Sequence, residues 1–285
     1  MDREDMKDMK FVKMEGCGND YIYVDGSKEQ VENKPEVVRR LSDRHYGIGG
    51  DGVIFINPSK QADFEMEMYN ADGSRSEMCG NGIRCVGKFV YDYRLTDKKQ
   101  LVVESFGVNR YLDLNCRNGK VESVCVNMGA PELIAKNVPV VSENETVLDE
   151  VITVGDKDYR MTCVSMGNPH AVVFVDHVDQ FPLESVGPLF EHHERFPKRV
   201  NAEFVEILDR KHVKMRVWER GTGETLACGT GCCATAVACI SNRLTEDEIT
   251  VILLGGELKI RWDKEKNCVY MTGPAKVTFE GVVQI

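Results

Sequence analysis

The sequence contains no long apolar run and no excess of basic residues. Because a membrane-spanning helix needs roughly 18–20 consecutive apolar residues, we expect no membrane association. The formal net charge is −10, which disfavours a surface for nucleic acid or anionic lipid, since both require a basic patch. The first ten residues, MDREDMKDMK, also lack the apolar segment of a secretory signal. We expect a solvated tail there.

Two further absences narrow the possible chemistry. The glycine-rich stretch GIGGDG (47–52) lacks the GK[ST] ending of a phosphate-binding loop. The adjacent Cys232 and Cys233 would point in different directions on a helix, and no second ligand pair is spaced to complete a zinc tetrahedron. The sequence therefore disfavours both a nucleotide site and a metal site.

Cysteine, by contrast, is abundant, with 11 residues. Their number is odd, the chain is long, and four of them crowd one segment: Cys228, Cys232, Cys233 and Cys239. A disulfide framework fits these features poorly. We therefore expect reduced thiols in a cytoplasmic protein.

Apolar patterning indicates a protein with both strands and helices. The chain has 285 residues, of which 42% are hydrophobic, enough for one large domain or two ordinary ones. Runs of alternating apolar residues predict strands, and longer runs with a period near 3.6 predict helices. The predicted strands are 21–25, 52–56, 64–70, 101–106 and 121–128, and the predicted helices are 35–47, 81–94 and 231–244.

An internal repeat organises these elements. Asn19 in a GND motif precedes Cys79 by 60 residues, and Asn168 in a GNP motif precedes Cys228 by the same 60 residues. We therefore expect an α+β fold of two pseudo-symmetric homologous halves, residues 1–126 and 127–274, with a strand at about 275–285 returning to the first half. Each half should be a mostly antiparallel sheet or barrel-like β structure around a central helix. We expect the active site in the cleft between the halves.

Each of the two repeated cysteines precedes a glycine-rich turn and a predicted helix, in EMCGNG and LACGTG. A helix N-terminus binds anions and stabilises a thiolate, which lowers the pKa of a cysteine. One thiolate could remove the α-proton of an amino acid while the other thiol protonates the opposite face. No lysine context for pyridoxal phosphate is evident, so we expect no cofactor. Four residues could donate hydrogen bonds to the carboxylate of the carbanion: Gly80, Asn81, Gly229 and Thr230.

Five motifs taken together resemble the diaminopimelate epimerase family, in order from about Lys10 to Ile285: KMEGCGNDYIYVD, YNADGSRSEMCGNGIRC, SMGNPHAVVFVD, HERFPKRVNAEF and ERGTGETLACGTGCCA. The resemblance implies cofactor-independent interconversion of LL- and meso-diaminopimelate, in the biosynthesis of lysine and peptidoglycan precursors. It also implies a homodimer, and it identifies Cys79 and Cys228 as the acid–base groups.

By the same resemblance, further residues line the substrate site. His170 and Glu219 would assist the thiols, and Gly80-Asn81 and Gly229-Thr230 would bind the reacting carboxylate. The remaining substrate-binding residues would be Asn19, Asn70, Asn168, Asn201, Glu219 and Arg220. Arg220 offers a fork for the distal carboxylate, and Glu219 and the asparagines can receive the ammonium group.

The motifs depart from the family in two places. Some members have a bulkier residue and a glutamine where this chain has Gly50 and Gly52, which leaves the role of this loop open. Thr230 stands where serine is common, and it keeps the hydroxyl group. Which of the two thiols is ionised at rest also stays open.

Two other functions remain as alternatives. One is a racemase or epimerase of another amino acid, such as proline or hydroxyproline, although Glu219-Arg220 and the asparagines favour an extended dicarboxylate. The other is a thiol redox or metal-binding module.

Overall fold

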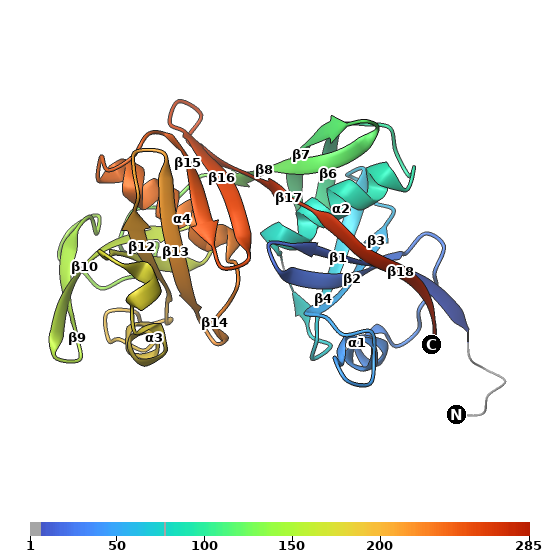
Figure 1. Ribbon diagram of the computed structural model, residues 1–285, viewed down its shortest axis with the longest axis horizontal. Coiled ribbons are helices and arrows are strands. Elements are labelled where there is room, and N and C mark those ends of the chain that lie inside the picture. The colour runs from blue at the N-terminus through green and yellow to red at the C-terminus, as the bar shows by residue number, and fades with distance from the viewer. Residues whose placement is uncertain (1–6, 77) are drawn as a thin grey trace. The chain divides into compact units, whose positions relative to one another are not determined.

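The structure, a computed structural model, describes residues 7–76 and 78–285. These form two compact units (Figure 1). The first unit comprises the chain up to Val126 together with Gly273–Ile285, and the second comprises Asn127–Thr272. None of the helices in these described ranges is long and apolar enough to cross a membrane.

The first unit is a sheet in the order β18–β1–β2–β3–β4–β6–β7–β8, with the short β5 paired to β4. The pairs β2–β3 and β4–β6 are parallel and the others are antiparallel. The strands are β1 (Asp8–Gly16), β2 (Asn19–Asp25), β3 (Gly52–Asn57), β4 (Phe64–Asn70), β5 (Arg75–Ser76), β6 (Gln100–Ser105), β7 (Val108–Arg117), β8 (Lys120–Gly129) and β18 (Lys276–Gln284).

The second unit repeats this plan in the order β9–β10–β11–β12–β13–β15–β16–β17, with β14 paired to β13. Here β11–β12 and β13–β15 are the parallel pairs. The strands are β9 (Glu150–Val154), β10 (Lys157–Ser165), β11 (Pro169–Phe174), β12 (Asn201–Ile207), β13 (His212–Glu219), β14 (Gly223–Glu224), β15 (Glu248–Leu253), β16 (Gly256–Asp263) and β17 (Cys268–Pro274).

A constant offset relates the two units. Tyr21 pairs with Gly52 across β2–β3, and His170 pairs with Asn201, 149 positions later in each case, across β11–β12. The same offset relates Cys79 to Cys228. The predicted α+β fold of two homologous halves, each with a mostly antiparallel sheet, is confirmed.

One buried helix packs against the sheet of each unit. Helix α2 (Gly80–Asp92) packs on β1, β2 and β7, and α4 (Gly229–Ser241) packs on β10, β11, β12, β15 and β16. Eleven of the 13 residues are buried in each helix. Small side chains let α4 approach the strands closely, as expected for a helix that is apolar nearly all round.

Helix α1 (Lys34–Ser42) is shorter than the predicted helix at 35–47. The Asp43 carboxylate accepts hydrogen bonds from the backbone N–H groups of His45 (2.7 Å) and Tyr46 (2.8 Å), and these bonds turn the chain. The turn requires glycine at position 47, because a Cβ there would lie 2.2 Å from the Arg40 carbonyl oxygen.

Helix α3 (Leu183–Glu191) was not predicted, because Pro188 interrupts its sequence pattern. It follows a short 3₁₀ turn, η2 (Val178–Gln180). Gly187 brings α3 against β13, since a Cβ at this position would lie 2.5 Å from the Trp218 ring.

The prediction that the first ten residues form a solvated tail is wrong for residues 8–10. Asp8–Lys10 belong to β1 and pair with Val282–Gln284 of β18. Figure 1 shows β18, in dark red, beside β1, in dark blue. Residues 1–6 of the predicted tail lie outside the described residues.

Candidate active site

Cys79 is the N-cap residue of α2. Its backbone is extended, and its Sγ accepts a hydrogen bond from the backbone N–H of Gly82 at 3.3 Å. This is the role that Ser, Thr or Asp usually fills at a helix N-cap. The sulfur therefore lies at the partially positive end of the helix.

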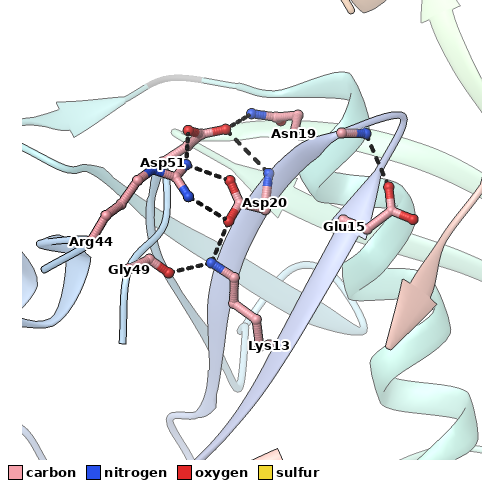
Figure 2. Close-up of polar contacts among 8 residues, drawn as sticks. Lys13, Glu15, Asn19, Asp20, Arg44, Gly49 and Asp51 are labelled. Atoms are coloured by element: carbon pink, nitrogen blue, oxygen red, sulfur yellow. Dashed lines mark hydrogen bonds and ion pairs between the residues drawn. The ribbon is translucent and has the colours of Figure 1, made fainter. Parts of the chain in front are cut away.

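Asn19, the first residue of β2, links Cys79 to the loop before β3. Its Oδ1 accepts a hydrogen bond from the Cys79 thiol, with an O–S distance of 3.0 Å. Its Nδ2 donates to Asp51 Oδ2 at 2.6 Å, a contact drawn in Figure 2. Asp51 in turn binds Arg44. Asn19 and Cys79, which are 60 positions apart in the chain, are thus in direct side-chain contact.

Cys228 is the N-cap residue of α4 in the same manner. Its Sγ accepts from the backbone N–H of Gly231 at 3.4 Å and lies 3.5 Å from the Thr230 hydroxyl. Asn168 Nδ2 donates to Thr230 Oγ1 at 3.3 Å. A Cβ on Gly231 would lie 3.3 Å from this sulfur and 2.7 Å from Glu203 Oε1, so the first turn of α4 requires glycine there.

His170 and Glu203 form a fully buried pair that contacts the Asn168 side chain through His170. His170 Nδ1 is 2.7 Å from Glu203 Oε1, and His170 Nε2 is 3.0 Å from Asn168 Oδ1. A carboxylate only accepts hydrogen bonds, so Nδ1 donates to Glu203 when that group is ionised. Glu203 Oε2 is buried and has no hydrogen-bond partner among the described residues.

Burial raises the pKa of Cys228 well above its ordinary value, and the nearby carboxylates of Glu219 and Glu203 raise it further. Thr230 and the Gly231 N–H act in the opposite direction and are outweighed. We expected the helix N-terminus to lower the pKa of both thiols. For Cys228 this expectation is wrong, because desolvation disfavours the thiolate more strongly than the helix N-terminus favours it.

Glu219, the last residue of β13, is a second perturbed acid. Burial raises the pKa of its carboxyl group, although hydrogen bonds from Thr225 and Cys228 act to lower it. A carboxyl group and a thiol whose pKa values are both raised therefore lie together near the start of α4. Paired groups of this kind are typical of acid–base catalysis.

The other predicted residues make different contacts. Asn201 is buried, donates to the Pro169 carbonyl (2.8 Å) and accepts from the Arg220 backbone N–H (2.9 Å). The Arg220 side chain is exposed and donates to the Lys198 carbonyl at 3.0 Å. Asn70 closes the turn after β4 by donating to Ser74 Oγ at 3.1 Å.

The predicted carboxylate-binding pairs form the first turns of the two helices. Gly80 and Asn81 begin α2, and both are buried. Asn81 Oδ1 has no hydrogen-bond partner among residues 7–76 and 78–285. Gly229 and Thr230 begin α4. Within the same described ranges, no group of three or more His, Cys, Asp or Glu side chains could hold a metal ion.

Comparison with known proteins identifies the family of this chain. The family model for diaminopimelate epimerase matches residues 11–134 and 162–278. A diaminopimelate epimerase of Methanococcus maripaludis is 55% identical over 277 residues, covering 97% of this chain and 100% of the relative. One from Acetivibrio thermocellus is also 55% identical, covering 97% of this chain and 99% of the relative.

The chain belongs to the diaminopimelate epimerase family.

Solved structures share the fold at low identity. A PhzF-family phenazine biosynthesis protein of Bacillus anthracis has a TM-score of 0.71 at 17% identity, covering 98% of this chain and 100% of that chain. A hydroxyproline epimerase of Agrobacterium vitis has a TM-score of 0.68 at 14% identity, covering 98% and 92%. These likenesses support the fold of two homologous halves.

Sequence reasoning about this diaminopimelate epimerase family member missed two acidic residues. Glu203 stands between Ala202 and Phe204 in a strand whose first five residues are all buried. An acid within so continuous an apolar run was a usable signal, because buried carboxylates are rare unless paired. Asp51 lies in the GIGGDG loop, whose role the sequence left open, and its contact with Asn19 depends on distant strand pairing.

Proposed function

We propose that this protein interconverts LL- and meso-diaminopimelate without a cofactor, using Cys79 and Cys228 as the two acid–base groups. The observation that carries the proposal is the matched chemistry of two N-cap thiols at equivalent positions. Each sulfur accepts a backbone N–H from the third residue of its own capping turn, Gly82 or Gly231. Membership of the diaminopimelate epimerase family supports the substrate.

The reaction is a proton transfer across one carbon. A thiolate takes the α-proton from one face, and the other thiol gives its proton to the opposite face. The second sulfur is left as the thiolate, so the two groups exchange roles in the reverse direction. The proposal requires both sulfurs to reach the same carbon in the substrate complex.

The carbanion formed between these steps needs electrostatic stabilisation. Its charge spreads into the adjacent carboxylate, and the unpaired N–H groups at a helix N-terminus are suited to bind it. Gly80-Asn81 and Gly229-Thr230 occupy these first-turn positions. We assign the carboxylate to these two turns. The buried Asn81 Oδ1, which has no hydrogen-bond partner in the part of the chain that the structure describes, is available to a substrate ammonium group.

Recognition of the distal end of the substrate falls to the longer polar side chains. Arg220 can exchange its contact with the Lys198 carbonyl for a paired contact with a carboxylate. Asn70, Asn168, Asn201 and Glu219 supply acceptors and donors for the remaining groups. An amino acid without the distal carboxylate would leave Arg220 without this partner.

The decisive experiment follows the α-protons of LL-diaminopimelate by NMR in D₂O with reduced protein. We expect exchange with solvent and formation of the meso isomer. Proline, hydroxyproline and lysine under the same conditions should show neither. An absence of exchange and of meso product would overturn the proposal, whereas turnover of proline or hydroxyproline would support the related racemases instead.

The proposal includes a cytoplasmic location, because catalytic thiols stay active only in reducing surroundings. It also includes a homodimer formed through β18. This strand carries exposed apolar side chains, with Val277, Phe279 and Val282 exposed by 37%, 45% and 58%. An exposed apolar strand is a common pairing surface.

Substituting Val282 by aspartate should therefore produce monomers, measured by light scattering after size-exclusion chromatography. A charge at this position removes apolar contact and repels a second copy. Tyr111→Asp is the matched control, since Tyr111 is also 58% exposed in the same unit but lies on β7. A Val282→Asp protein with the same mass as the Tyr111→Asp protein would contradict the assignment.

A further inference from the structure

A charged cluster holds Asn19 in place at the start of β2; Figure 2 shows it. Arg44 bridges Asp20 (2.7 Å) and Asp51 (2.9 Å) with one guanidinium nitrogen. The backbone N–H of Asp51 also donates to the Asp20 carbonyl at 2.7 Å. The cluster, called here the Asp51 cluster, comprises Lys13, Asp20, Arg44, Asp51 and the Gly49 carbonyl.

Ion pairing within this cluster favours the charged forms of Asp20 and Arg44. Lys13 is buried and binds both the Asp20 carboxylate and the Gly49 carbonyl. Hydrogen bonds from Arg44 and Lys13 outweigh the effect of burial and lower the pKa of Asp20. The same pairing raises the pKa of Arg44. Asp51 is therefore anchored to the start of β2 by Arg44 and by its own backbone N–H.

Asp51 decides which end of the Asn19 amide faces Cys79. Asp51 Oδ2 lies 2.6 Å from Asn19 Nδ2, and an ionised carboxylate can only accept a hydrogen bond. The amide NH₂ group must therefore face Asp51. The carbonyl Oδ1 is then directed at the Cys79 sulfur, 3.0 Å away.

We infer that Asp51 is a positioning residue, which acts through the Asn19 amide to make the Cys79 sulfur a stronger base. An oxygen acceptor beside a sulfur favours the thiol over the thiolate. The thiolate, once formed, takes a proton more readily, which suits an α-carbon that is a weak acid. This inference rests on the proposed function of Cys79 as an acid–base group.

The second unit has no carboxylate at the position equivalent to Asp51. Val200 stands 149 positions after Asp51 and provides no carboxylate. There the amide of Asn168 turns its Nδ2 toward Thr230 and its Oδ1 toward His170. The two equivalent asparagines thus present opposite ends to their helix N-termini, and Asp51 accounts for the orientation in the first unit.

Among the described residues of the first unit, the ionisable groups that interact electrostatically with Cys79 include Tyr21 and Tyr23 on β2 and Cys85 on α2. Arg84, also on α2, donates to the carbonyl of Gly80, the residue after Cys79. These four residues are the same in the wild type and in Asp51→Asn.

The test measures how the alkylation rate of Cys79 by iodoacetamide depends on pH in the substrate-free protein. Mass spectrometry resolves the tryptic peptide 76–84, in which Cys79 is the sole cysteine. Asp51→Asn can donate as well as accept, so the Asn19 amide can turn its NH₂ group to the sulfur. The midpoint of the profile should fall by about one pH unit, since a hydrogen bond to a charged group is exchanged.

A double-substitution cycle separates orientation from charge. If Asp51 acts through the amide, Asp51→Asn should leave the midpoint unchanged when Asn19→Ala is already present. If the loss of a negative charge is the cause, the shift should persist in that background. Asp63→Asn is the matched control, because Asp63 also pairs with a base, Lys98, and binds a backbone N–H, that of Val102.

Three results would overturn the inference: an unshifted midpoint in Asp51→Asn, an equal shift in the Asn19→Ala background, or an equal shift in Asp63→Asn. Asp51→Ser, which cannot hold Asn19 and Arg44 together, serves as a second variant with the same expected direction if Asp51→Asn does not fold. Alkylation needs no turnover. A failure of the Asp51 effect is therefore distinguishable from a failure of wild-type epimerisation, which would instead remove the proposed function.

Discussion

Replacing either Cys79 or Cys228 by alanine should abolish net epimerisation while leaving the fold intact. General acid–base groups typically contribute about 10²–10⁴-fold to a rate, and this reaction depends on one such group on each face of the carbon. The loss in kcat should lie at or beyond the upper end of that range in both variants. Conversion of LL- to meso-diaminopimelate, followed by NMR, measures it.

Exchange of the α-proton in D₂O gives a sharper version of this experiment. A variant with one thiol can still remove and return a proton on a single face. Any residual exchange should therefore be confined to one stereochemistry at the reacting carbon in Cys79→Ala, and to the other in Cys228→Ala. Exchange of the same stereochemistry in both variants would contradict a division of the two faces between the two sulfurs.

The helices supply matched controls for this pair of variants. Cys85 lies on α2 and Cys233 on α4, and neither side chain is exposed. Alanine at either position removes a buried sulfur without touching the N-cap, at a cost of about 1 kcal/mol in stability. Wild-type turnover in these controls, with none in the N-cap variants, would locate the effect at the helix starts.

The sequence was sufficient to predict the repeated framework and the position of Cys79 and Cys228 directly before the two buried helices. The 60-residue spacing from Asn19 to Cys79, and from Asn168 to Cys228, reflects equal numbers of strands between equivalent positions. Local patterns also predicted α2 and α4, because a glycine-rich turn precedes each buried helix. Helix α3 was missed, since Pro188 breaks the local pattern while packing against Trp218 compensates for it.

Features that depend on how deeply a side chain is buried, or on contacts between residues far apart in the sequence, could not be predicted. The sign of the Cys228 pKa shift depends on how deeply α4 packs against its strands, which no local spacing reveals. The position of Asp51 beside Asn19 depends on the parallel pairing of β2 with β3. In both cases the chemistry at a cysteine is set by residues far away in the chain.

Glu219 should destabilise the folded protein at neutral pH. Burial raises the pKa of this carboxyl group in the folded state, so the folded protein binds a proton there more tightly than the unfolded chain does. The stability that this proton confers is present below the unfolded value, near 4.5, and is lost as the pH rises through the raised folded value. Above that folded value the ionised group is held in a poorly solvated site.

Glu219→Gln should consequently raise the thermal midpoint at pH 7 by a few degrees, since about 1 kcal/mol shifts a chain of this size by roughly 2–4 °C. The amide can still accept a hydrogen bond from Thr225. The advantage over the wild type should shrink as the pH falls and the wild-type carboxyl group takes up its proton. Calorimetry at several pH values tests this sign.

The same substitution should lower the pKa of Cys228, because one of the carboxylates that raise it is removed. Alkylation of Cys228 at a given pH should become faster, resolved from Cys232, Cys233 and Cys239 by fragment ions. Epimerisation should fall by about 10–100-fold, the worth of one hydrogen bond to a charged group. Lower stability at pH 7, or slower alkylation, would contradict this account of Glu219.

Glu224→Gln is a control that separates the effect of the buried environment of Glu219 from the effect of losing any one negative charge. Glu224 lies on β14, near Glu219, but it is paired with Arg216 at 2.7 Å. Removing its charge breaks an ion pair rather than relieving a buried carboxylate, so stability should fall slightly or stay unchanged. Opposite signs for the two variants would show that the site near Cys228 is maintained at the expense of folding, as expected where catalysis requires a carboxylate in a poorly solvated place.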